Sequence, residues 1–306
     1  MSNYSLEDLL PETNLCSLKI DGAVAHLTLM REDVYNAMNV ELISEIISIL
    51  DWTKERSVGE RGLLKDENGS EYLRVIVFRG AGKHFCAGAD INMMRDAGAK
   101  SPEENRADSE RLDRLFHSLW SHPCFTIGKV QGVALGGGAG LIACLDHVFG
   151  VANFHPVDSP NKEAQRRFDI KIALSEGKLG ILPAVIGPYV YRKVGSAEFR
   201  RLAMLAGRIG AKEAKHVGLI KSYGLDSEIE SFEIPRIIDE VLTTGPMAVA
   251  EAKKLTLTFD RWNGTDEELR LWTLDKTSEM RGSREGQEGL ASFLEKRPPD
   301  WKIDPE

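Results

Sequence analysis

The stretch Phe125-Thr126-Ile127-Gly128-Lys129-Val130 and the glycine-dense segment from Gly132 to Gly140 that follows it decide the fold of this chain. The first stretch is mostly apolar or β-branched, so it predicts a short buried strand. The glycines then predict a turn in which backbone can approach a ligand closely. A second unit of this kind comes earlier, where the nearly continuous apolar run over 73–78 leads into His84-Phe85-Cys86-Ala87-Gly88-Ala89-Asp90. The sequence therefore predicts two similar strand-to-turn units.

Strands and amphipathic helices alternate before about residue 195, and helical patterns dominate after it. A strand is predicted over 23–30, and a helix from Leu42 towards Lys54. Ser101-Pro102-Glu103-Glu104 is a helix start with a capping box. The helices predicted beyond residue 195 cover 197–206, 211–217, 234–243, 247–259 and 266–280, the last behind a Thr265/Glu268 capping box. This order predicts an α/β core over residues 1–195 and a helical C-terminal region over 196–306.

Composition excludes several classes of protein. The chain has 306 residues, 42% of them hydrophobic, which is enough for a sizeable core without a metal or disulfide. Forty-seven acidic and 39 basic residues give a net charge of −8, which disfavours binding to nucleic acid or anionic lipid. The four cysteines are widely spread and form no zinc pattern, so we expect reduced thiols and no metal. With no targeting or membrane-spanning pattern in the sequence, we expect a cytoplasmic protein.

The two glycine turns are the candidate source of chemistry. If they converge, each can direct one free backbone N–H group at the same oxygen atom, which forms an oxyanion hole. The alternative is that the glycines serve only tight turns and close packing. Familiar motifs fail elsewhere. For example, Gly80-Ala81-Gly82-Lys83 lacks both the first glycine of a phosphate loop and the Ser or Thr after the lysine.

The two segments and their spacing resemble the crotonase (enoyl-CoA hydratase/isomerase) superfamily, and the resemblance extends over roughly residues 15 to 300. It continues through the segments 173–184 (ALSEGKLGILPA) and 210–219 (GAKEAKHVGL), and through Glu285-Gly286 and 293–297 (FLEKR). The resemblance implies an α/β fold with a spiral core of ββα turns, followed by an α-helical C-terminal trimerisation region. It also implies an acyl-CoA substrate and assembly into a homotrimer or homohexamer.

Carried over position by position, the resemblance makes Ala89 and Gly137 the N–H donors to the thioester oxygen and Glu176 the acid–base residue. It assigns coenzyme A contacts to Ala87, Asp90, Ile91, Phe293 and Lys296. The last two would contact the coenzyme from the C-terminal helix, in the same chain or from a neighbouring subunit. Their alternatives are an ordinary core phenylalanine and a solvated lysine.

One position departs from the pattern of the family. Members that hydrate simple straight-chain enoyl-CoAs usually carry a second glutamate where this chain has Gly140. A single glutamate must then both activate water and protonate carbon, unless something else holds the water. One carboxylate also suffices to move a proton between two carbons, as in an isomerase. Because Leu174 and Leu179 are apolar, we expect burial to raise the pKa of Glu176 towards the range of a general base.

The amino-acid sequence of residues 174–190 is most similar to that of bacterial 3-methylglutaconyl-CoA and isohexenylglutaconyl-CoA hydratases. This favours a hydratase for a branched or carboxylated enoyl-CoA, with no cofactor beyond the coenzyme A of the substrate. The alternatives are an enoyl-CoA isomerase, a non-catalytic acyl-CoA-binding paralogue, or a decarboxylase or hydrolase variant. Asp146 and Glu176 are separated by 29 residues, about twice the family's usual gap, so 153–169 is a surface loop or a lid. Residues 57–71 are a second predicted surface insertion.

Overall fold

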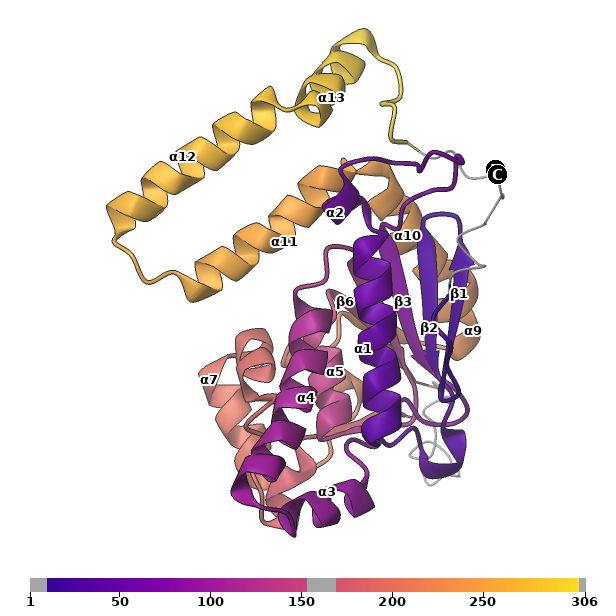
Figure 1. Ribbon diagram of the computed structural model, residues 1–306, viewed down its shortest axis with the longest axis vertical. Helices are drawn as coiled ribbons and strands as arrows, with labels where there is room; N and C mark the ends of the chain where they lie inside the picture. The colour runs from indigo at the N-terminus through magenta and orange to yellow at the C-terminus, as the bar shows by residue number, and fades with distance from the viewer. Residues whose placement is uncertain (1–9, 153–168, 303–306) are drawn as a thin grey trace, which may run out of the picture.

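The computed structural model describes residues 10–152 and 169–302, and these form a mixed α/β protein (Figure 1). Its main sheet has six strands in the order β1-β2-β3-β4-β6-β8. They are β1 (Cys16–Asp21), β2 (Val24–Leu29), β3 (Val75–Gly80), β4 (Phe125–Val130), β6 (His147–Val151) and β8 (Ser222–Gly224). β1 pairs antiparallel with β2, and all other pairs are parallel. β5 (Val133–Leu135) and β7 (Lys171–Ala173) form a separate parallel pair.

Helices surround the main sheet and extend beyond it. They are α1 (Val40–Glu55), α2 (Val58–Arg61), α3 (Ile91–Gly98), α4 (Pro102–Trp120), α5 (Gly137–Cys144), α7 (Gly187–Leu205), α8 (Ala211–His216), α9 (Asp226–Glu228), α10 (Ile234–Thr243), α11 (Pro246–Arg261), α12 (Asp266–Gly282) and α13 (Arg284–Glu295). Short helical turns, η2 (Glu32–Val34), η3 (Ser175–Leu179) and the π-helical η4 (Ile229–Glu233), complete the elements. No helix among the described residues has the length and apolar character needed to cross a membrane.

β3, inside the main sheet, is buried on both faces, which explains why it is almost continuously apolar. In β3, Ile76 and Phe78 belong to the large core cluster that includes the apolar side of α1. Val75 and Val77 alternate with them and pack on the opposite face, in the cluster that includes residues of η4 and α10. α1 and α10 therefore cover opposite faces of the sheet (Figure 1).

The last two helices, α12 and α13, project away from the core and are called the C-terminal arm below (Figure 1). No residue of α12 is buried, and large apolar side chains of the arm remain exposed: Leu271 (49%), Leu274 (54%), Leu290 (50%), Phe293 (82%) and Leu294 (79%). The base of the arm is held by Arg74, whose guanidinium donates to the carbonyls of Val241, Leu242 and Thr244 at the end of α10 and to that of Trp301.

Most predicted elements are confirmed. Both capping boxes form, at Ser101/Glu104 and at Thr265/Glu268. The expectation that only helices follow residue 195 is wrong, because β8 lies beyond it and pairs with β6 of the core sheet. A three-residue strand is recognisable only by its partner. The predicted boundary coincides instead with a kink in α7, where Gly195 has φ 76° and ψ 169°.

Two further expectations concern surface segments. The segment 57–71 was predicted to be a surface insertion, and it contains the short helix α2. α2 begins with the buried Val58 and contacts α11, so the start of the segment belongs to the packed body. Residues 153–168, which make up nearly all of the predicted loop or lid, lie outside the described residues.

Candidate active site

The two glycine turns meet, as an oxyanion hole requires. The strand ends are aligned by hydrogen bonds from the Cys86 amide to the Val133 carbonyl and from the Leu135 amide to the Cys86 carbonyl, each 3.1 Å. As a result, a Cβ built on Gly88 would lie 3.3 Å from the Gly137 nitrogen. A Cβ built on Gly137 would lie 3.6 Å from the Ala89 nitrogen. The two predicted donors therefore face one small volume.

Hydrogen bonds on the far side of each peptide hold the two donors in position. The Gly88 carbonyl accepts from the Met38 amide at 2.7 Å, so the trans N–H of Ala89 in the same peptide plane points the opposite way. The Gly136 carbonyl accepts from the Gly140 amide at 3.1 Å, so the Gly137 N–H points out of the start of α5. In 10–152 and 169–302 neither donor is paired with an acceptor. Both are free for a ligand oxygen.

Glu176 is carried to these amides by the small sheet. β7 pairs with β5, and the Gly136 amide donates to the Ala173 carbonyl at 2.8 Å, so η3 starts beside Gly136. The Glu176 Oε1 atom lies 3.0 Å from the position of a Cβ on Gly136. Its Oε2 atom is buried without a hydrogen-bond partner among the described residues. Burial raises the pKa of this carboxyl above its ordinary value, and its own backbone N–H opposes the rise only in part.

The conformation of two glycines is required for this approach. Gly136 has φ 50° and ψ −116°, a combination that side chains disfavour strongly, and a Cβ there would crowd Glu176. Gly88 has φ 97°, and a Cβ there would lie 2.5 Å from the Leu135 carbonyl oxygen. The glycines therefore serve close packing, as one interpretation of the sequence expects, and they leave the two amides unpaired; the use of these amides as an oxyanion hole stays a prediction.

The position of the missing carboxylate is closed rather than vacant. Gly140 lies inside α5, where a Cβ would overlap the Ile186 Cγ2 atom and stand 3.0 Å from Phe116 Cε1. Ile186 and Phe116 are 4% and 1% exposed. The side chain of Ile186 occupies the space into which a residue at 140 would project. The described residues therefore place one carboxylate, Glu176, at the two amides.

The predicted coenzyme contacts fall into two groups. Ala87, Asp90 and Ile91 flank Ala89, with Ile91 65% exposed at the start of α3. Asp90 accepts from Arg31 at 3.0 Å and from the Asn92 amide at 2.9 Å, so its carboxylate anchors this turn to η2 and caps α3. These bonds hold the pKa of Asp90 below its ordinary value, although partial burial opposes them.

Phe293 and Lys296 lie on and just after α13, at the opposite end of the molecule from α3 (Figure 1). The structure does not bring them to Ala89 within one chain. Phe293 is 82% exposed, so the alternative that it is a core residue is wrong. Their contact with coenzyme A stays a prediction, and it requires the arm of a neighbouring subunit.

Two residues of the site were not singled out from the sequence. The fully buried Met38 holds both neighbours of Ala89, because its amide donates to Gly88 and its carbonyl accepts from Asp90 at 2.9 Å. No local feature of the sequence predicts that a methionine at this position holds the turn.

Ser175 stands beside Glu176, and its hydroxyl lies 3.3 Å from the Cβ position of Gly136. The only signal in the sequence was its position directly before Glu176.

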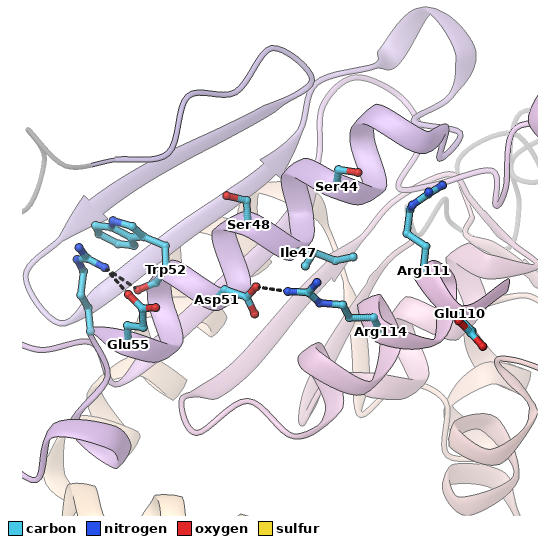
Figure 2. A pocket seen from close by; sticks show the side chains of 10 residues that line it. Ser44, Ile47, Ser48, Asp51, Trp52, Glu55, Glu110, Arg111 and Arg114 are labelled. Atoms are coloured by element: carbon cyan, nitrogen blue, oxygen red, sulfur yellow. Dashed lines mark hydrogen bonds and ion pairs between the residues drawn. The ribbon is translucent and has the colours of Figure 1, made fainter. Parts of the chain in front are cut away.

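A groove on the outer side of α1 and α4, with a volume of about 700 Å³, contains none of these residues. Figure 2 shows that Asp51 points across it towards Arg114, and the two form an ion pair of 2.7 Å. Arg56 likewise contacts Glu55 at 3.5 Å. Because these charges pair with one another at an exposed surface, the groove offers no comparable constellation.

Comparisons with known proteins show which family and which folds the chain is similar to. A family model described as enoyl-CoA hydratase/isomerase matches residues 19–304. A Bacillus subtilis protein named "Probable enoyl-CoA hydratase" is 30% identical over 292 residues, which cover 94% of this chain and 99% of that protein. The crystal structure of an enoyl-CoA hydratase from Shewanella pealeana superposes with a TM-score of 0.81 at 32% identity, covering 97% of this chain and 100% of that one. The peroxisomal Delta(3,5)-Delta(2,4)-dienoyl-CoA isomerase of Arabidopsis thaliana is 28% identical over 248 residues, 78% of each chain.

Proposed function

The chain belongs to the enoyl-CoA hydratase/isomerase family, and on that premise we propose that it adds water to the double bond of an enoyl-CoA, or removes it, with Glu176 as its single acid–base residue. The observation that carries the proposal is the position of one half-buried carboxylate, with one oxygen fully buried, beside two unpaired backbone N–H groups. A thioester oxygen bound by Ala89 and Gly137 would gain negative charge as the reaction proceeds. Fixed donors of this kind stabilise that charge most strongly where water is excluded.

The chemistry follows from that arrangement. Glu176 takes a proton from water as the water oxygen bonds to the β-carbon of the enoyl group. The electron pair of the double bond moves towards the thioester oxygen, which the two amides hold. Glu176 then delivers a proton to the α-carbon, and dehydration is the reverse. A raised pKa suits both halves, because the carboxyl must first accept and then release a proton near neutral pH.

We propose a branched or carboxylated enoyl-CoA, of the methylglutaconyl type, as the substrate. The similarity of residues 174–190 to hydratases of that type supports this choice. The alternative is an isomerase that moves a double bond with the same glutamate. The closed position at Gly140 favours it, because proton transfer between two carbons needs one carboxylate and no site for water. The dienoyl-CoA isomerase among the relatives is a reason to test it.

We also propose that the protein assembles into homotrimers or homohexamers and uses no cofactor beyond the coenzyme A of its substrate. The exposed apolar side chains of the C-terminal arm support assembly, because surfaces of this kind are normally covered in a stable protein. Assembly would also bring Phe293 and Lys296 to a neighbouring subunit's site.

Mass spectrometry of a panel of enoyl-CoAs that differ in branching and charge tests the function. With water labelled by heavy oxygen, a hydratase gives a product that has gained one labelled water. An isomerase incubated in deuterated water gives a product of unchanged oxygen content, and a non-catalytic paralogue binds without turnover.

Glu176→Gln should lower turnover by about a hundred- to ten-thousand-fold. The matched variant Glu103→Gln, at an exposed position in α4, should turn over normally. Full activity in folded Glu176→Gln would refute the assignment.

A further inference from the structure

We propose that Ser175 is the second polar group of this site and that its hydroxyl holds the water molecule that Glu176 activates. The inference rests on the proposed function and adds a residue to it. It answers the question raised by Gly140, because a site with one carboxylate still has to hold water in a defined position.

The placement of Ser175 carries the proposal. Ser175 and Glu176 open η3, and their side chains reach the same side of Gly136. Ser175 Oγ lies 3.3 Å, and Glu176 Oε1 3.0 Å, from the single point where a Cβ of Gly136 would stand. Because both oxygens lie close to that one point, they are near enough to each other for a single water molecule to bridge them. The absence of a side chain at Gly136 leaves that approach open.

Both groups can form a hydrogen bond with water. Among the described residues, Glu176 Oε2 is buried without a hydrogen-bond partner, and the Ser175 hydroxyl beside it can both donate and accept. Ser175 is only partly exposed, so its hydroxyl faces the protein as well as solvent. Buried polar groups are normally satisfied by protein or by ordered water, so Glu176 is expected to bind an ordered water, and the Ser175 hydroxyl is the neighbouring polar group that can share it. A hydroxyl can donate and accept at once, which suits it to orient a nucleophilic water.

The side chains that a Cβ on Gly137 or Gly140 would meet first are poorly suited to this role. Met38 is the neighbour that a Cβ on Gly137 would meet first, at 2.6 Å from its Cε atom. Ile186 and Phe116 fill the position of the missing carboxylate. All three are apolar and cannot bind water.

The step balances without any further reactant. One hydrogen of the water passes to Glu176 as the oxygen bonds to the β-carbon, and the other hydrogen bonds to Ser175 Oγ and stays on the product hydroxyl. Ser175 keeps its own proton throughout. Glu176 returns its proton to the α-carbon. Ser175 is therefore needed for water addition and not for proton transfer at the α-carbon.

That difference separates its role from a structural one. The two reactions are hydration of an enoyl-CoA and exchange of the α-hydrogens of the saturated acyl-CoA with deuterated water, which requires Glu176 and the amides alone. In Ser175→Ala we expect kcat for hydration to fall roughly tenfold, the loss expected for one hydrogen bond, with KM and the exchange rate within about twofold of wild type. Ser175→Thr keeps a hydroxyl and should stay within about threefold. Ser48→Ala, on the exposed side of α1, is the matched control and should change neither reaction.

Two results would overturn the role of Ser175. Unchanged hydration in Ser175→Ala shows that the hydroxyl is not used, and a parallel fall of hydration and exchange shows that Ser175 only supports the loop. Failure of the proposed function gives a different pattern, in which wild type hydrates no member of the panel or folded Glu176→Gln retains hydration. That pattern overturns both proposals.

Discussion

Replacing Gly140 with alanine tests whether packing closes the position of the missing carboxylate. In a helix interior exposed to solvent, this change would stabilise the protein by about 1 kcal/mol. Here the new Cβ would overlap Ile186 Cγ2 and stand 2.9 Å from Ile186 Cβ and 3.0 Å from Phe116 Cε1. Overpacking of a core of this kind costs about 1–3 kcal/mol. We therefore expect Gly140→Ala to lower the free energy of unfolding by about 1–2 kcal/mol.

A double-mutant cycle identifies the cause. Ile186→Ala alone should lower the free energy of unfolding by about 2–5 kcal/mol, because it leaves a cavity. In the double variant, the methyl group at position 140 enters that cavity, so the combined loss should be smaller than the sum by about 1–3 kcal/mol. The expected sign of the coupling follows from the overlap of the two side chains.

Guanidinium unfolding at one fixed protein concentration measures all four proteins, because assembly would make stability depend on concentration. The control is Gly98→Ala at the end of α3, where a Cβ would meet nothing within 4 Å and no loss of stability is expected. If Gly140→Ala is as stable as wild type, or if the two losses simply add, position 140 is open. The claim that a carboxylate cannot be accommodated there would then be wrong.

Three further predictions follow from the same contacts. Burial raises the pKa of Glu176, so its ionisation opposes folding as pH rises above the ordinary value of 4.5. Glu176→Gln should therefore be more stable than wild type at neutral pH but not below pH 4.5, and parallel pH–stability curves for the two proteins would contradict this. The kcat of wild type should rise with pH through the raised pKa. Gly88→Ala puts a Cβ on a residue with φ 97° and against the Leu135 carbonyl, so the neighbouring Ala89 amide should move. The kcat should then fall about a hundred-fold or more. A variant with normal kinetics would exclude Ala89 as a donor. Arg74→Met leaves carbonyls at the end of α10 unpaired, so it should lower the free energy of unfolding by about 2–4 kcal/mol. The C-terminal arm should also be cut faster by a protease. Unchanged proteolysis would show that Arg74 does not hold the arm.

Local signals in the sequence were sufficient for many of the regular elements. The apolar run at 125–130 is β4, and the helix predicted over 234–243 is α10. Serine and threonine caps set the starts of α4 and α12, because a side-chain oxygen three residues from its partner amide acts within the chain itself. The two glycine turns and Glu176 were also found from sequence, with the help of a family pattern.

Other features have no local signal. β8 is too short to be recognised without β6 beside it. Met38 holds the Ala89 peptide across about fifty residues of chain, and Ile186 fills the space at Gly140 across a similar distance. A methionine or an isoleucine in the sequence does not indicate which distant residue it will contact.

The amino-acid sequence by itself determined many of the strands and helices, where two of the helices are capped, and which turns can expose backbone donors. Those properties arise from side-chain preferences and hydrogen bonds within a few residues. Only the tertiary structure decided that the two donor amides face each other, that Glu176 and Ser175 reach over Gly136, and that Ile186 closes the second acid position. Those outcomes depend on packing between segments that are distant in sequence, where shape and burial, rather than local preference, choose the neighbour.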